Sequence, residues 1–342
     1  MYNNNFILRE DILLVEKPIY AAINLTNRCN FRCKHCYVKE QKNLCDNELT
    51  LSKWKSILDI LRNNGVFILT LTGGEILSHP DFLDVYKYAY DLGFKLKLIS
   101  NLSLFNDACL ELFKTRKPEK IVVSLYGITN DTYHSFCEYY GTADKIYKNL
   151  LLLKNNDINV EVNIILNEYI LSEYPHIIEF LKANNIIFHL YRKIFCETTG
   201  NMEPLQLRID PKQEFESYLL VKDINQLEIQ MSNKEDLWEE GIKFCTAGLT
   251  SFFIDSEGYA SPCAQTSEHR FNILEDDYTS ICNNMRKIRN TEICHSTGCS
   301  VCEFRNYCGK CAPLCKKMGI TQSGCFEKSR AIYLKKELEK YV

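Results

Sequence analysis

Three cysteines near the start of the chain, Cys29, Cys33 and Cys36, have the spacing Cys-x3-Cys-x2-Cys. Cysteine thiolates are the usual ligands of iron–sulfur clusters, so three of them this close together can hold three corners of a four-iron cluster. The fourth iron is then left without a protein ligand, and an open metal position lets a metal bind and activate a substrate. The alternatives are thiols that bind no metal, or a structural zinc site in which His35 is the fourth ligand.

A second group of cysteines lies at the other end of the chain. Ten of the 17 cysteines fall between Cys245 and Cys325. Such a density in a chain without a secretory signal is more typical of metal binding than of disulfides, which are rare in reducing compartments. The pairs within this array, each with two residues between the cysteines, would also suit tetrahedral zinc. Two kinds of metal centre therefore stay open for this part of the chain.

Short β-like runs and amphipathic helical segments alternate along the first part of the chain and must position these residues. Trp54, Ile57, Leu58 and Leu61, for example, recur at helical spacing and end at an Asn-Asn-Gly stop signal. Such alternation predicts an α/β fold with a parallel sheet, and right-handed crossovers would curl it into a partial (β/α)6 TIM-type barrel. The predicted strands are 19–25, 66–71, 94–99, 120–125, 159–166 and 186–191.

Polar residues at the predicted strand ends gather at one edge of such a sheet, where the chemistry of barrel enzymes takes place. The cysteine triplet follows the first strand, and Gly73-Gly74-Glu75 follows the second. Two glycines after a strand often form only a tight turn, but they also let a ligand approach the backbone closely. The other candidates at this edge are Asn101 after the third strand, Ser124 in the fourth and Arg192 after the sixth.

The segment Leu25–Tyr37, which reads LTNRCNFRCKHCY, closely resembles the signature of radical S-adenosylmethionine enzymes. This resemblance implies that S-adenosylmethionine chelates the open iron and is cleaved to a 5′-deoxyadenosyl radical, which abstracts a hydrogen atom from the substrate. It also implies a flavodoxin or ferredoxin as electron donor. The cofactor-binding residues that it indicates are His35, Gly73, Gly74, Glu75, Asn101, Ser124 and Arg192. Glu75 would supply a counter-charge to the methionine amino group.

Two positions depart from the pattern of that family. Many relatives carry an aspartate where this chain has Tyr126, so a polar contact to the cofactor is altered or absent. Relatives often have an arginine near position 138, where this chain has Glu138. We therefore transfer no cofactor role to that position.

The distal array resembles the SPASM extension of radical enzymes, a small cysteine-rich iron–sulfur domain that houses auxiliary clusters. The resemblance implies two auxiliary [4Fe–4S] clusters that accept an electron or bind the substrate. The ligands it implies for the first are Cys245, Cys263 and Cys311. Those it implies for the second are Cys299, Cys302, Cys308 and Cys325. Cys315 lies close to Cys311, and either could be the ligand; the first cluster then has an open iron or recruits Cys315.

Length and composition set the frame for these sites. A chain of 342 residues is expected to form one large and one smaller domain. We predict a radical enzyme core over 1–200, a linking segment over 201–243 and the auxiliary-cluster domain over 244–342. A net charge of −3 gives no bulk attraction to nucleic acid or to an anionic membrane. Without a long apolar run or a secretory signal, the expected location is the cytoplasm.

Enzymes with a SPASM extension commonly modify ribosomally made peptides by crosslinks, thioethers or epimerisation. The resemblance therefore favours a peptide substrate, which docks directly or through a separate recognition protein. Sulfatase activators have an acidic residue directly after a first-cluster cysteine, whereas Ala264 follows Cys263 here. The alternatives are a tetrapyrrole side-chain-modifying enzyme and a non-catalytic iron–sulfur or zinc protein. Cys196, just past the sixth predicted strand, is a candidate hydrogen-atom donor to a substrate radical.

Overall fold

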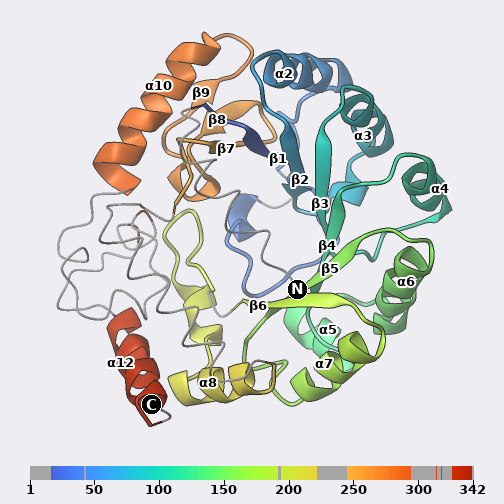
Figure 1. Cartoon of the computed structure of the whole chain (residues 1–342), viewed down its shortest axis with the longest axis vertical. Helices are drawn as coiled ribbons and strands as arrows, with labels where there is room; N and C mark the ends of the chain where they lie inside the picture. The colour runs from blue at the N-terminus through green and yellow to red at the C-terminus, as the bar shows by residue number, and fades with distance from the viewer. Residues whose placement is uncertain are drawn as a thin grey trace.

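The computed structural model consists of one curved sheet surrounded by helices (Figure 1). The residues that it describes are 17–41, 44–191, 194–221, 245–293, 313, 317 and 326–340. Strands β1 to β6 lie side by side in sequence order, and all are parallel. They span Tyr20–Thr26, Ile68–Gly73, Lys95–Ser100, Lys120–Leu125, Val160–Ile165 and Ile187–Tyr191. The predicted partial barrel is therefore confirmed, with strand ends shifted by at most two residues.

Alternation of side chains explains why the sheet carries helices on one face. In β4 the residues Ile121, Val123 and Leu125 are buried, whereas the residues between them are half-buried. Successive residues of a strand face opposite sides, so the apolar set lies under the helices and the other set lines the concave face. The apolar stripe of α2, Leu51–Asn63, covers this apolar side in turn, because Trp54 and Leu58 are fully buried.

The other helices form a ring outside the strands (Figure 1). They are α3 Phe82–Asp91, α4 Asp107–Thr115, α5 Asn130–Cys137, α6 Ala143–Asn155, α7 Tyr174–Ala183, α8 Pro211–Leu219, α10 Tyr278–Ile288 and α12 Phe326–Leu338. Short turns are η1 Lys39–Gln41, η2 Ile76–Ser78, η3 Glu203–Leu207, η4 Ala264–Thr266 and the π-helical η5 Arg289–Ile293. None of the described helices is long and apolar enough to cross a membrane.

Strands β7 Ser251–Ile254, β8 Tyr259–Ser261 and β9 Phe271–Asn272 continue the same sheet beyond β1. β7 is parallel to β1, with Tyr20 opposite Ser251, and β8 and β9 follow as an antiparallel meander. The hydrogen-bonded sheet thus runs across the boundary that the sequence analysis predicts at residue 244. The division into three segments stays a prediction, while the start of the third segment shares its sheet with the first.

Helix α12 is anchored to α8 through a buried ion pair. Arg330 bonds the carboxylate of Glu214, which is almost inaccessible to solvent, and also donates to the carbonyl of Ile209. A buried carboxylate needs such a partner, because an isolated charge is costly to bury. The end of the chain is therefore fastened beside the segment that follows the barrel.

Candidate functional site

The loop that carries the cysteine triplet follows β1 and rests on the end of α5. The backbone N–H of Arg32 donates to the carbonyl of Cys137 at 2.6 Å, and that of Lys34 donates to Phe136 at 3.0 Å. These carbonyls belong to the last turn of α5, where helices leave their acceptors without partners. Cys33 is buried, and Cys29 and Cys36 are partly exposed. The cysteine loop is thus held by a helix end that lies about a hundred residues later in the sequence.

Aromatic rings from α5 and from the residues just after it pack against the loop. Phe31 is fully buried, and its ring centroid lies 4.5 Å from that of Tyr139. The His35 ring stacks on Phe136, with a centroid separation of 5.1 Å and an interplanar angle of 6°. The sequence analysis considers His35 a possible zinc ligand. Among the described residues, no three or more His, Cys, Asp or Glu side chains surround a single point where one metal ion could sit.

The Gly73-Gly74 turn packs directly against the chain that leads into the triplet. Gly74 donates its N–H to Thr26 at 2.8 Å, and a Cβ on Gly74 would lie 2.3 Å from the Arg28 oxygen and 2.9 Å from Cys29 Cβ. Gly73 has a φ of +146°, and its Cβ would lie 2.5 Å from the Thr26 oxygen. No side chain fits at either position, so the glycines form a backbone cradle beside the cysteines.

The Glu75 side chain is fully buried and joins the ends of β2 and β3. One oxygen accepts from Ser100 Oγ at 2.7 Å and from the Leu77 N–H at 3.1 Å, and the other accepts from the Asn101 N–H at 2.6 Å. Burial raises the pKa of Glu75, and these three donors oppose that rise. The carboxylate is therefore a brace between two strand ends, a role that the sequence analysis did not foresee.

Asn101 and Ser124 lie where the sequence analysis expects them. Asn101 Nδ2 donates to Asn30 Oδ1 at 3.1 Å, which ties the end of β3 to the cysteine loop. Ser124 lies on the concave side of β4, opposite Asn163 of β5. Arg192 lies outside the described residues. The cofactor contacts of these side chains stay predictions.

Glu48 is a second carboxylate that holds the site and that the sequence analysis missed. It accepts from Thr26 Oγ1 and from the Asn27 N–H, both at 2.6 Å, and from Arg28 Nε at 3.1 Å. Burial alone would raise its pKa, but these bonds outweigh burial and lower the pKa of Glu48. Its position just before a predicted helix gave no indication of this contact, because its partners are about twenty residues away.

Cys196 is fully buried in the segment that returns from β6 to the cysteine loop. Two residues later, the Thr198 N–H donates to the Tyr37 carbonyl at 2.8 Å. Burial raises the pKa of the Cys196 thiol, and the nearby Lys317 lowers it to a smaller extent. The thiol thus lies in a segment that touches the residue after Cys36, while its role as hydrogen-atom donor stays a prediction.

The described part of the distal array contains Cys245, which is exposed, and Cys263, which precedes η4. Burial raises the pKa of the Cys263 thiol, and a hydrogen bond from Thr266 Oγ1 at 3.6 Å opposes this. Burial and the neighbouring Cys36 and Cys263 together raise the pKa of Tyr37 to about 12. The remaining predicted ligands lie outside the described residues: Cys299, Cys302, Cys308, Cys311, Cys315 and Cys325.

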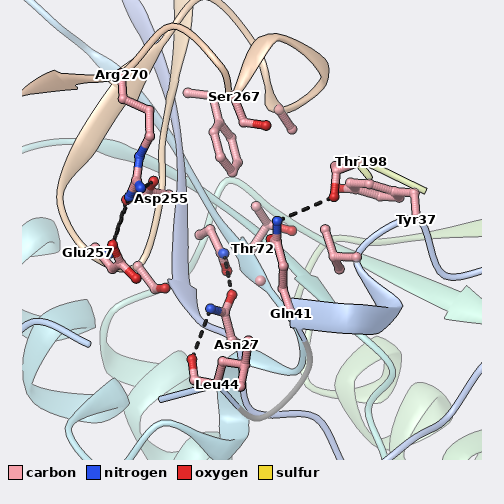
Figure 2. Close-up of a pocket in the computed structure, with 16 residues that line it drawn as sticks. Asn27, Tyr37, Gln41, Leu44, Thr72, Thr198, Asp255, Glu257, Ser267 and Arg270 are labelled. Carbon is pink, nitrogen blue, oxygen red and sulfur yellow. Dashed lines mark hydrogen bonds and ion pairs between the residues drawn. The ribbon is translucent and has the colours of Figure 1, made fainter. Parts of the chain in front are cut away.

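A cavity of about 240 Å³ opens between the ends of β1, β2 and β7. Figure 2 shows Asn27, Gln41 and Thr72 on one side of it and Asp255, Glu257 and Arg270 on the other. Tyr37, next to Cys36, and Ala264, next to Cys263, also line it. The cavity therefore lies between the first cysteine loop and the beginning of the distal array.

This arrangement fits the cofactors that the sequence motif implies. Three thiols on one loop supply a cluster's cysteine ligands, and the Gly73-Gly74 turn packs so closely against this loop that neither position has room for a Cβ. A comparison with family models matches residues 23–181 to the radical SAM superfamily. Residues 23–181 of this chain form a radical SAM domain. The family implies S-adenosylmethionine and one [4Fe–4S] cluster as its cofactors.

Relatives of this chain span most of its length. The AdoMet-dependent heme synthase of Methanosarcina barkeri is 24% identical over 88% of this chain and 93% of its own. The antilisterial bacteriocin subtilosin biosynthesis protein AlbA of Bacillus subtilis is 27% identical over 86% of this chain and 67% of its own. Streptococcus suis SuiB bound to its precursor peptide SuiA has the same fold, with a TM-score of 0.68 and 17% identity over 94% of this chain and 74% of SuiB.

Proposed function

We propose that this radical SAM enzyme modifies a ribosomally made peptide by abstracting a hydrogen atom from it. The observation that carries the proposal is the cysteine loop with its glycine cradle at the mouth of a partial barrel. Support for a peptide substrate comes from the likeness to the bacteriocin biosynthesis protein AlbA over most of the chain. When bound, S-adenosylmethionine on a reduced four-iron cluster supplies the hydrogen-abstracting radical.

The residues of this chain hold and orient these groups. Cys29, Cys33 and Cys36 bind the cluster, and the backbone of Gly73 and Gly74 accommodates the methionine end of the cofactor. Glu75 and Asn101 act by positioning, because their bonds fix the ends of β2 and β3 against the cysteine loop. Packing of Phe31 and His35 against neighbouring aromatic rings holds the loop in place.

The auxiliary clusters are the second part of the proposal. Cys245 and Cys263, with Cys311 or Cys315, hold the first, and Cys299, Cys302, Cys308 and Cys325 hold the second. The spacing of these cysteines supports this assignment. It is also supported by the cavity, because Tyr37, next to Cys36, and Ala264, next to Cys263, both line it. Such clusters accept the electron that a substrate radical loses, or bind a substrate thiolate. A flavodoxin or ferredoxin would reduce the cluster on Cys29, Cys33 and Cys36, and a separate recognition protein would present the peptide.

A tetrapyrrole side chain is the second candidate substrate. The heme synthase of M. barkeri is aligned with this chain over 93% of its length, which favours this reading. The peptide reading has its own support in the bacteriocin biosynthesis protein AlbA, which is aligned with this chain over 86% of the chain's residues.

Coexpression with small peptides encoded beside the gene tests the proposed function. The peptides are examined by mass spectrometry after expression with the enzyme and with a Cys33→Ser variant. Expression is repeated in D2O, and the proposal expects, with the wild-type enzyme alone, either a mass change such as the loss of two hydrogens or the deuterium that an epimerised residue acquires. Unmodified peptides, together with conversion of a tetrapyrrole by the same cluster-loaded enzyme, would replace the peptide reading by the alternative.

The role of Cys196 is tested separately. If its thiol donates a hydrogen atom to a substrate radical, Cys196→Ala should abolish the deuterium that an epimerised residue acquires in D2O, while 5′-deoxyadenosine still forms. Full turnover to an unchanged product by Cys196→Ala would rule the role out. Cys109→Ala, which removes another buried thiol, is the control for packing effects.

A further inference from the structure

Lys34 lies inside the cysteine loop, between Cys33 and His35, and both its backbone and its side chain are fixed. Its backbone N–H donates to the Phe136 carbonyl at 3.0 Å. Its side chain extends to the loop after β5, where Nζ donates to the Tyr169 hydroxyl and lies 4.3 Å from the centre of the Tyr169 ring. Ordering a long lysine side chain costs rotamer freedom, and these two contacts to one ring offset that cost.

Tyr169, which anchors this lysine, is itself held from two sides. Its backbone N–H donates to the buried Asn167 Oδ1 at 3.0 Å. Its ring packs against Phe136, with a centroid separation of 5.4 Å, and Phe136 stacks in turn on His35. The anchor of Lys34 therefore belongs to the same row of rings that supports the cysteine loop.

The contacts of Lys34 fix its charge without neutralising it. A phenol hydroxyl and an aromatic ring attract an ammonium group, but both are uncharged and leave its net charge in place. Within the part of the chain that the structure describes, the partner of Lys34 Nζ is this tyrosine and not a carboxylate. Arg28, at the start of the same loop, differs because it pairs with Glu48 at 3.1 Å. Lys34 thus brings an uncompensated positive charge to the cysteine loop.

The position of this charge couples it to the cysteine ligands. Consecutive Cα atoms are about 3.8 Å apart, so Lys34 Nζ can lie no further than about 10 Å from the Cα of Cys33. Cys33 is buried and Lys34 is half-buried, so water and salt screen the charge less than that of the exposed Arg32. Net charge and solvent exposure are among the factors that set the reduction potential of an iron–sulfur cluster.

We propose that Lys34, held by Tyr169, is a redox-tuning residue that raises the reduction potential of the cluster on Cys29, Cys33 and Cys36. The inference rests on the proposed function, because it requires that cluster. One electron passes from the reduced flavodoxin or ferredoxin to the cluster, and no bond forms or breaks in this step. The fixed ammonium group favours the added negative charge and so eases the reduction. Tyr169 acts only by positioning Lys34.

Redox potentiometry of the anaerobic, cluster-loaded full chain tests this role without turnover. The EPR signal of the reduced cluster is followed against potential, and its change on addition of S-adenosylmethionine distinguishes it from other clusters. For Lys34→Met we expect the equilibrium constant of reduction to fall about tenfold, which is about 59 mV for one electron. Lys34→Arg keeps the charge and should restore most of the potential. Tyr169→Phe, which removes only the hydroxyl, should lower the potential by about half as much.

Lys55→Met is the matched control, because Lys55 on α2 lies 5.1 Å from the centre of the Tyr88 ring on α3. This variant removes the same kind of contact outside the cysteine loop and should leave the potential unchanged. Should Lys34→Met lose its cluster, Tyr169→Phe carries the test, because it keeps Lys34.

An unchanged potential in the cluster-loaded variants overturns the inference. An equal fall in Lys34→Met and Lys34→Arg also overturns it, because the role would then be structural and not one of charge. A wild-type chain that assembles no four-iron cluster on the cysteine triplet would instead refute the proposed function, so the two failures are distinguishable.

Discussion

At the scale of single residues, contacts of the glycine backbone define the site more than side-chain contacts do. Gly74 lies against Arg28 and Cys29, so the Gly73-Gly74 turn and the metal-binding loop are in direct contact. The sequence identified both motifs because their spacing is local. It could not identify Glu48 or the brace made by Glu75, since those contacts join residues that meet only after the strands align.

Replacing Gly74 with alanine tests the contact between the glycine turn and the metal-binding loop. The new Cβ would overlap the Arg28 carbonyl, which is backbone and cannot rotate away, so we expect the cysteine loop to move and the cluster content to fall sharply. Iron, sulfide and absorbance near 400 nm measure the loss. Gly65→Ala is the control, because nothing lies within 4 Å of its Cβ and only its φ of +90° causes strain. An unchanged cluster in Gly74→Ala would contradict the account.

The Glu75→Gln variant tests the brace between β2 and β3. Whichever way the amide turns, its NH2 group faces the backbone N–H of Leu77 or of Asn101, so a hydrogen bond becomes a repulsion. The free energy of unfolding should fall by about 3 kcal/mol, as expected when buried hydrogen bonds to a charged group are lost. Urea unfolding measures the difference, and Glu111→Gln should change stability by less than about 0.5 kcal/mol.

At the scale of elements, α5 and the loop before it support the cysteine loop. The carbonyls of Phe136 and Cys137 accept from that loop, and Glu173, just before α7, holds the start of α5. Glu173 accepts from the Ile128 N–H at 2.6 Å and from Thr132 Oγ1 at 2.7 Å, and it also bonds Thr129. The alternating pattern of the sequence predicted the six parallel strands, but not this bracing.

Glu173→Gln tests this support through its pH dependence. Burial alone would raise the pKa of Glu173, but the hydrogen bonds from Thr129 and Ile128 outweigh burial and lower the pKa below 4.5. The ionised group therefore stabilises the fold above that pH, and its contribution disappears as the pH falls through the lowered pKa. We expect the variant to be about 1 to 2 kcal/mol less stable at pH 7, with the difference shrinking below pH 4.5. A difference that grows in acid would contradict this assignment.

At the scale of the whole molecule, one sheet connects the cysteine loop with the beginning of the distal array. β7 pairs with β1, which places Asp255 and Ala264 at the same cavity as Tyr37. Periodicity in the sequence does not reveal which strand a short segment such as β7 joins. The boundary between core and extension was thus harder to predict than either set of cysteines.

Iron content measures the proposed number of clusters. Three [4Fe–4S] clusters correspond to about 12 iron atoms per chain, and a variant with Cys29, Cys33 and Cys36 all changed to alanine should keep about 8. Anaerobic reconstitution followed by iron and zinc analysis gives both values. About 4 iron atoms together with bound zinc would instead support a zinc site in the distal array.

Reductive cleavage of S-adenosylmethionine is the most direct test of the central claim. The anaerobic, cluster-loaded chain is incubated with dithionite and S-adenosylmethionine, and the nucleoside products are separated by chromatography. The account predicts 5′-deoxyadenosine from the wild-type protein and none from Cys33→Ser, with circular dichroism showing that the variant is folded. The absence of 5′-deoxyadenosine would contradict the account, provided that the cluster on Cys29, Cys33 and Cys36 is spectroscopically intact and reducible in the wild-type sample.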